Sequence, residues 1–287
     1  MDLPVVVGVD GSEPSLRAVD WAADEAALRG APLRLVYASL WERYEGALLA
    51  QELGKPAEEV MALDVVGAAE SRARRRHPEL EVTTAVLPEE PGYGLVHESR
   101  SARIVVLGSR GRSGITEALL GSVSVTVAGH AHCPVIVLRG SHDNTVTRRR
   151  VVLGAEGKPA QSAAVRFATE EAVLRSVPLE AVRAWRRSAH TALGHPLRAD
   201  EPAHASEQGA AEAVEEALRD APKELELHWR TVEGHARDVL VAASHGAGLL
   251  VVGARHRHGR FGLQLGRIAH GVLHRAACPV AVVPEPV

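Results

Sequence analysis

The sequence predicts an α/β protein of two tandem doubly wound domains, each a five-stranded parallel sheet with helices on both faces. Two observations lead to this prediction: the chain contains one unit written twice, and each copy alternates short apolar runs with longer segments of helical periodicity. Continuous apolar runs are typical of parallel strands that are buried on both faces. Right-handed crossovers then place helices on either side of each sheet.

Internal repetition sets the domain organisation. VVVGVDG at 5–11 corresponds to VVLGAEG at 151–157, a shift of 146 positions, and segments nearer the end of each copy correspond at a shift of 145. One deletion in a loop accounts for the difference. We therefore predict a first domain over 1–140 and a second over 149–287, joined by a polar stretch with turn-forming residues.

The elements of the first copy follow in order. An apolar run over 4–9 predicts the first strand, and Ser12 with Pro14 predicts the start of a helix that ends near Gly30. The remaining pattern predicts strand 33–39, helix 57–76, strand 80–87, helix 93–101, strand 104–107, helix 122–130 and strand 135–138.

Two of these helices carry expectations about packing. In helix 57–76 the apolar residues at helical spacing, expected on its buried side, are Val60, Leu63, Val66 and Ala69. Trp21 and Phe167 correspond in the first helix of the two copies, which indicates core packing.

Composition excludes several classes of protein. The net charge of −3, from 33 basic and 36 acidic side chains, gives no electrostatic footprint for nucleic acid. No apolar run approaches the roughly 20 residues that span a bilayer, and the N-terminus shows no secretory signal. A cytoplasmic protein is expected. The two cysteines, Cys133 and Cys278, cannot form a disulfide framework and are expected to be buried.

A glycine-rich segment after the fourth strand has the chemistry of a phosphate loop. Gly108 and Gly111 lack Cβ atoms, so backbone N–H groups can approach an anion. Gly121 and Ser122 open a helix whose free N–H groups attract phosphate. Arg110 adds charge suited to phosphate oxygens. The segment has no lysine, so it is no Walker loop, and the chain lacks G-x-G-x-x-G. The glycines are also compatible with a simple strand–helix turn.

The spacing Gly108-x2-Gly111-x9-Gly121-Ser122 resembles the ATP-binding signature of the universal stress protein family. VVVGVDGS at the start and HCPVIVL near 138 are similar to that family too, and both repeats take part. The resemblance implies a five-stranded sheet of order 3-2-1-4-5 in each domain, with ATP held between strands one and four.

The resemblance also implies individual contacts. Val9 and Asp10 would lie beside the adenosine, and Ala38 would meet the adenine through backbone groups. The ribose and phosphates of ATP, accompanied by Mg²⁺, would be held by Gly108, Arg110, Gly111, Gly121, Ser122, Val123 and Ser124. An aspartate before a glycine is also common turn chemistry, which is the alternative for Asp10.

The second copy departs from the signature. His256 stands in the place of Gly111, Arg267 in the place of Ser122, and Glu156 in the place of Asp10. We therefore predict weak or absent ATP binding in the second domain. The alternative is a different anion site formed by the arginines of this segment: Arg255, Arg257, Arg260 and Arg267.

No metal site is predicted. His270 and His274 are one helical turn apart, a spacing that can bind a metal ion. No cysteine or carboxylate completes a clear ligand set.

Three classes of function remain. The first is a nucleotide-binding stress or signalling protein with ATP in the first domain. The second is a slow ATPase or phosphotransferase, for which no catalytic residue is assigned, because Glu117 is the only nearby carboxylate. The third is a nucleotide-free scaffold. The expected partners are adenine nucleotide and a second copy, through a homodimer or an internal pairing of the two repeats, with no nucleic acid and no membrane.

Overall fold

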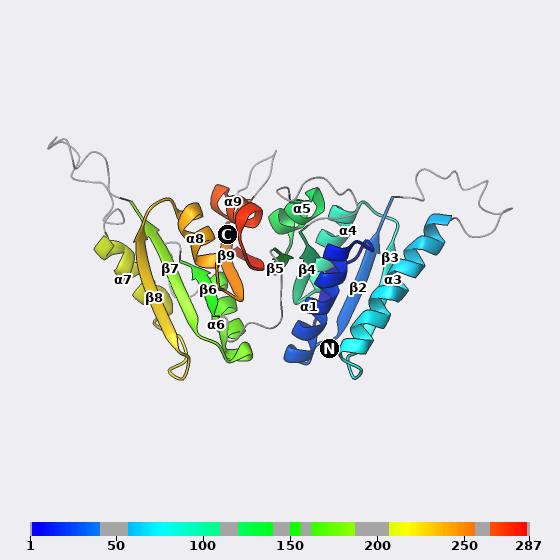
Figure 1. Ribbon diagram of the computed structural model, residues 1–287, viewed down its shortest axis with the longest axis horizontal. Coiled ribbons are helices and arrows are strands. Elements are labelled where there is room, and N and C mark those ends of the chain that lie inside the picture. The colour runs from blue at the N-terminus through cyan, green and yellow to red at the C-terminus, as the bar shows by residue number, and fades with distance from the viewer. Residues whose placement is uncertain are drawn as a thin grey trace. The chain divides into compact units, whose positions relative to one another are not determined.

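The computed structural model describes residues 2–40, 57–109, 120–139, 150–155, 162–186, 207–255 and 265–285. The chain divides into two compact units, each built of five parallel strands covered by helices (Figure 1). This architecture confirms the predicted fold class.

The sheet of the first unit has the implied order. Its strands run β3 (Val82–Leu87), β2 (Leu33–Ala38), β1 (Val5–Gly8), β4 (Ile104–Gly108) and β5 (Val135–Leu138) across the sheet. The central strand β1 pairs in parallel with both neighbours, Val5 lying opposite Leu33 on one side and Ile104 on the other. Strand order therefore reverses between β1 and β4, the position at which doubly wound sheets bind ligands.

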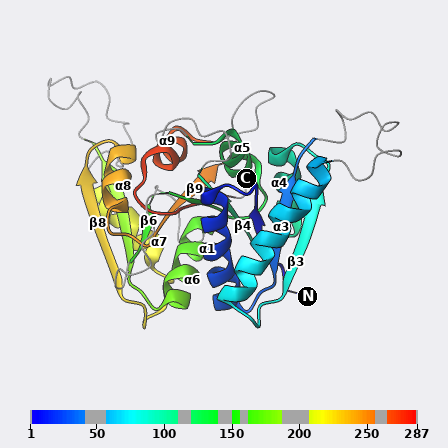
Figure 2. The ribbon, with the colours of Figure 1, turned by 45° about the vertical axis from the view of Figure 1, so that its right-hand side comes forward.

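Helices cover both faces of this sheet. On one face lie α1 (Glu13–Arg29) and α3 (Ala57–Arg76), which pack side by side in Figures 1 and 2. On the other lie α4 (Pro91–Glu98) and α5 (Ser122–His130), which pack against each other. The predicted helix 93–101 is thus α4 followed by a 3₁₀ turn at Ser99–Ser101.

Both predicted ends of α1 are confirmed. Ser12 is the N-cap, and its side chain accepts a hydrogen bond from the backbone N–H of Ser15. Gly30 ends the helix with φ +61°, a left-handed conformation that glycine adopts without strain. The entry of the chain into α1 is therefore fixed by local sequence.

The predicted buried side of α3 is partly wrong. Val66 and Ala69 are buried, but Val60 and Leu63 are 44% and 46% exposed. The buried row instead follows small residues at Ala62, Val66, Ala69 and Ala73. Small side chains let α3 approach α1 and the sheet closely. Which face of α3 is buried therefore depends on this close packing and not on the size of the apolar side chains.

Two smaller expectations also need correction. Phe167 is buried as expected, whereas Trp21 is only half-buried. The third strand begins at Val82 and not at residue 80, because Leu80 is buried within the turn that precedes it.

Ion pairs join α1 to α3 at the surface. Arg72 donates two hydrogen bonds to Asp20, at 2.7 and 2.6 Å. One turn further on, Arg76 donates two to Asp24, which also contacts His77 at 2.8 Å. Each is a two-bonded guanidinium–carboxylate pair, the geometry that orients such partners best.

The second unit repeats the topology. Its strands run β8 (Leu227–Glu233), β7 (Leu179–Trp185), β6 (Val151–Gly154), β9 (Leu249–Arg255) and β10 (Val280–Glu285). The helices of this unit are α6 (Ala163–Arg175), α7 (Glu207–Leu218), α8 (Ala236–Ser244) and α9 (Arg267–Arg275).

Three further features concern what the chain can bind. None of the described helices is long and apolar enough to cross a membrane. Cys133 and Cys278 are both buried, as expected. Within the described residues, no group of three or more histidine, cysteine or acidic side chains is arranged to hold a metal ion.

Candidate functional site

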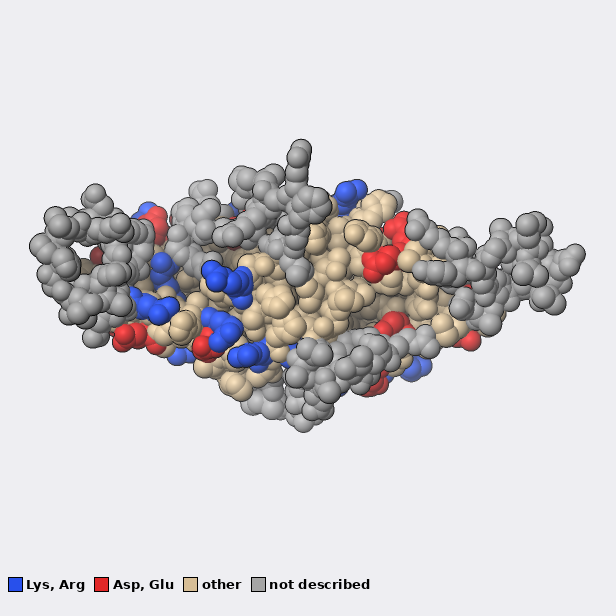
Figure 3. Space-filling model, turned by 90° about the horizontal axis from the view of Figure 1, so that it is seen from above, with Lys and Arg blue, Asp and Glu red and all other residues tan. Residues whose placement is uncertain are grey.

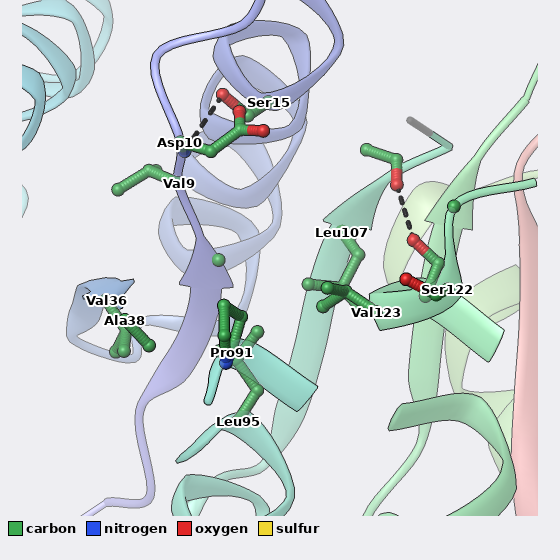
Figure 4. A pocket seen from close by; sticks show the side chains of 14 residues that line it. Val9, Asp10, Ser15, Val36, Ala38, Pro91, Leu95, Leu107, Ser122 and Val123 are labelled. Carbon is green, nitrogen blue, oxygen red and sulfur yellow. Dashed lines mark hydrogen bonds between the residues drawn. The ribbon is translucent and has the colours of Figure 1, made fainter. Parts of the chain in front are cut away.

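A cavity of about 200 Å³ lies at the carboxyl ends of β1, β2 and β4 in the first unit, where the strand order reverses (Figure 4). The residues expected from the sequence that line it are Val9, Asp10, Ala38, Gly108, Gly121, Ser122, Val123 and Ser124. Two further expected residues, Arg110 and Gly111, lie outside the described residues.

The floor of the cavity depends on a glycine. A Cβ at Gly8 would lie 2.7 Å from a side-chain carbon of Leu107 and 2.9 Å from one of Leu95. Both leucines line the cavity together with Pro91 and Val36, and none of these four was expected from the sequence. They come from β2, β4 and α4, so only the folded sheet with α4 against it brings them together.

Asp10 organises the turn between β1 and α1. Its Oδ1 accepts hydrogen bonds from the backbone N–H of Ser12 at 3.0 Å and from the Ser12 hydroxyl at 2.6 Å. Gly11 between them has φ +80°, which favours glycine. Asp10 therefore fills the turn role that its sequence context allows, and it also stands on the wall of the cavity (Figure 4).

Two hydrogen bonds close the base of the glycine-rich segment. The hydroxyl of Ser124 donates to the carbonyl oxygen of Gly108 at 2.8 Å, and this bond is buried. The backbone N–H of Gly121 donates to the carbonyl oxygen of Ser109 at 2.9 Å. The segment between residues 109 and 121 is thus held where it leaves β4 and where it enters α5.

Gly108 lies in close contact with α1. A Cβ at this position would lie 2.8 Å from both the carbonyl carbon and the oxygen of Pro14. The end of β4 therefore reaches its place only with glycine at position 108. The first glycine of the motif is thus required by packing against α1, in addition to the room that it gives an anion near the backbone.

The start of α5 presents the electropositive end of a helix to the cavity. Gly121 is the N-cap and makes no side-chain capping hydrogen bond. The first N–H groups of a helix lack partners within it, and the helix dipole adds partial positive charge there. The exposed hydroxyl of Ser122 stands at the same point. The combination suits an anion.

The cavity therefore has two chemically different walls. Val36, Pro91, Leu95 and Leu107 form an apolar side. The start of α5 adds the hydroxyl of Ser122 (Figure 4) and the first N–H groups of that helix. Sites of this kind suit a ligand with a flat apolar part and an anionic part.

The matching region of the second unit differs in its chemistry. Gly253 matches Gly108 and Gly266 caps α9, but Arg267 is exposed at the first position of that helix. Buried Ala269 takes the place of Ser124 and has no hydroxyl to donate. Glu156, His256, Arg257 and Arg260 lie outside the described residues. In Figure 3, basic side chains gather over the half of the view that contains α8 and α9.

The fold and this cavity define the class: a tandem α/β protein with a cavity at the switch point of a parallel sheet. The family model of the universal stress protein family matches residues 3–139 and again 147–284. The chain therefore belongs to the universal stress protein family, with two tandem domains of that family.

Known universal stress proteins match this chain over nearly its whole length. Universal stress protein Rv2005c of Mycobacterium tuberculosis is 32% identical over 305 residues, covering 98% of this chain and 97% of the relative. A universal stress protein of Mycolicibacterium smegmatis is 30% identical and covers 97% of this chain and 96% of its own. The crystal structure of a universal stress protein from Archaeoglobus fulgidus matches with a TM-score of 0.63 at 18% identity, covering 98% of both chains, which supports the fold alone.

Proposed function

We propose that this protein binds ATP in its first unit, with Mg²⁺ on the phosphates, and acts as a nucleotide-binding stress or signalling protein. The observation that carries the proposal is that eight of the ten expected contact residues line one cavity at the switch point of the sheet. Residues far apart in the sequence, such as Ala38 and Ser122, meet there.

The walls of the cavity fit the two halves of this ligand. The apolar side formed by Pro91, Leu95 and Leu107 suits a purine ring. The start of α5 suits the phosphates, because its N–H groups are not capped by a side chain of the described residues. The residues that would hold Mg²⁺-ATP are those of the glycine-rich segment, with the cation bound mainly through phosphate oxygens and water.

The activity that we propose for the cavity is nucleotide binding, without catalysis of a reaction. Positioning groups are present, but a phosphoryl-transfer enzyme also needs a group that orients or deprotonates the nucleophile. Asp10, the carboxylate on the cavity wall, accepts two hydrogen bonds from Ser12. It is engaged in the turn that starts α1.

Titration calorimetry with ATP tests the proposal. The wild-type chain is expected to bind one ATP, and Gly111→His, which introduces the residue found at the matching position 256, is expected to abolish binding. His256→Gly is the matched control in the second unit and is expected to leave binding unchanged. A wild-type chain that takes up no ATP would overturn the proposal. Release of inorganic phosphate in the same samples, at more than one turnover per bound nucleotide, would make the protein an ATPase.

We also propose that two copies of the fold pair, within one chain or between two chains. The proposal rests on the family resemblance. Sedimentation equilibrium of the full chain tests it, since a mass of 30.5 kDa leaves only the internal pairing and twice that mass indicates a homodimer.

A further inference from the structure

A second cavity of the first unit lies at the opposite edge of its sheet. Its volume is about 880 Å³. The residues directly before three strands line it: Pro4 before β1, Pro32 before β2 and Glu81 before β3. Because these strands pair in parallel, their amino ends meet at one edge, which is the edge where Figures 1 and 2 mark the N-terminus. The candidate nucleotide site lies at the carboxyl ends and is separate from it.

The lining of this cavity is largely apolar. Pro4, Pro32 and Pro78 contribute proline rings, which bring no backbone N–H donor. Leu3, whose side chain is 50% exposed, and Ala26 of α1 also line it. Small-molecule sites have volumes of about 300–1,000 Å³ and combine an apolar lining with a few polar groups. The size and the lining therefore suit a small organic ligand.

Carboxylates surround the apolar lining. Asp2, Glu79 and Glu81 all line the cavity, and all three are exposed. Within the part of the chain that the structure describes, none of these three carboxylates makes a hydrogen bond or an ion pair. They are therefore available to a positively charged group.

The basic residues of the lining do not compensate these charges, because both are paired elsewhere. Arg34 donates two hydrogen bonds to Glu98, at 2.7 and 3.2 Å. His77 contacts Asp24 at 2.8 Å. Glu98 and Asp24 are not lining residues of the cavity, so the three carboxylates of the lining keep an excess of negative charge.

The ends of two helices add to the negative potential. α1 and α3 both end at this edge, and the lining residues Gly30 and His77 directly follow them. The carboxyl end of a helix carries partial negative charge and favours cations. In the last turn of α3, Arg74 and Arg76 pair with acidic residues of α3 and α1, and the exposed Arg75 is not a lining residue.

The matching edge of the second unit has a different charge. The turn before β8 repeats the sequence of 79–81 at 224–226 but adds Lys223 just before it. Arg150 stands directly before β6, where the first unit has a proline, and it forms an ion pair with Glu180. The acidic edge is therefore a property of the first unit and not of the fold in general.

We propose that this cavity binds a small organic cation, in which an ammonium or guanidinium group is carried on an apolar body. The proline and leucine side chains of the lining contact the apolar body. The cationic group lies beside the carboxylates of Asp2, Glu79 and Glu81. The proposal is independent of ATP binding, because the two cavities lie at opposite edges of the sheet.

Three probes of one shape and different charge test the proposal: 4-phenylbutylamine, 4-phenylbutan-1-ol and 4-phenylbutyrate. Each is titrated into the full chain while backbone amide resonances are recorded. The amine is expected to shift the amides of Gly30, Glu79 and Glu81 with saturation, and to bind about fivefold more tightly than the alcohol. The butyrate is expected to bind most weakly. Added sodium chloride should weaken binding of the amine and not of the alcohol.

A pair of charge-removing variants identifies the carboxylates. Glu79→Gln/Glu81→Gln changes little in shape and is expected to lower the affinity for the amine about fivefold, while the affinity for the alcohol stays the same. Glu224→Gln/Glu226→Gln removes two matching charges from the second unit and is expected to change neither affinity.

The results that would overturn the proposal are equally specific. They are an amine that shifts none of these amides, an amine that binds no more tightly than the alcohol, or an unchanged affinity for the amine in folded Glu79→Gln/Glu81→Gln. A chain that failed to bind ATP would still give the expected results, so the two proposals can fail separately.

Discussion

The hydroxyl of Ser124 donates a buried hydrogen bond of 2.8 Å to the carbonyl oxygen of Gly108. Gly108 ends β4 and Ser124 lies in the first turn of α5, so the bond closes the glycine-rich segment at its base. It holds the start of α5 against the end of the strand, which is where the anionic part of a ligand would lie. The second unit has Gly253 and Ala269 at these positions and lacks the donor.

Removing this hydroxyl should weaken both the fold and ATP binding. Ser124→Ala leaves the buried carbonyl oxygen without its donor, which we expect to lower the free energy of unfolding by about 1–2 kcal/mol. ATP affinity is expected to fall about tenfold or more as the helix start loses its position. Urea unfolding and calorimetry measure the two effects. Ser101→Ala, at an exposed 3₁₀ turn, is the control. Unchanged ATP affinity in folded Ser124→Ala would show that the bond does not position the site.

Two glycine-to-alanine changes should have opposite effects. Gly108→Ala places a methyl group 2.8 Å from the backbone of Pro14, which cannot move aside as a flexible side chain does. We therefore expect the free energy of unfolding to fall by about 1–3 kcal/mol. Gly67 lies on an exposed part of α3 with open space at its Cβ position. Gly67→Ala is expected to stabilise the protein by about 0.5–1 kcal/mol through helix propensity. Thermal unfolding of both variants measures the difference, and equal effects would contradict the packing at Gly108.

The free energy of unfolding of the protein should depend on pH through the ionisation of Asp24. Burial by itself raises the pKa of this carboxyl, but hydrogen bonds from Arg76 and His77 outweigh it and hold the pKa below its ordinary value of 3.8. A lowered pKa in the folded state means that the contribution is present above pH 3.8 and is lost as the pH falls through the lower value.

Asp24→Asn tests this dependence. Because the Asp24 side chain is 43% exposed, we expect this variant to lower the free energy of unfolding by at most about 1 kcal/mol at pH 7. The difference from wild type should shrink toward zero as the pH falls below the folded-state pKa. Urea unfolding across pH 2–7 measures it. A difference that stays constant over this range would mean that the charge of Asp24 does not act on stability.

The thiol of Cys133 should be unreactive in the native protein. Burial raises the pKa of its thiol to about 12, so almost no reactive thiolate exists near neutral pH. Cys278 is buried as well. With a thiol reagent such as 5,5′-dithiobis(2-nitrobenzoate) at pH 8, we expect labelling of both cysteines only at the rate of unfolding. Fast labelling without denaturant would show that the core opens locally at these strands.

The fold was predictable because its signals are local and repeated. The buried strands are continuous apolar runs, and Ser12 and Gly30 mark the ends of α1 by capping chemistry that needs no tertiary context. The exposed Val60 and Leu63 show the limit of this approach. Periodicity identified the helix, but which face is buried depends on how closely the small residues of α3 approach their neighbours.

The candidate site was predictable only in part, because its spacing motif covers the strand end and the helix start. The apolar wall of Pro91 and Leu95 comes from α4, and no spacing in the sequence relates that helix to Gly108. The hydrogen bonds from Ala163 and Ala164 to Glu285 were equally hidden, because more than 120 positions separate the partners in the sequence.

Native mass spectrometry with ATP at graded concentrations tests the central claim most directly, because it counts nucleotides per chain. We predict that the chain of 30.5 kDa gains the mass of one ATP and no more. Ser124→Ala should lower the occupancy of this site, whereas Ala269→Ser should not. Two nucleotides bound with equal affinity, or a single one that Gly111→His leaves in place, would contradict the account.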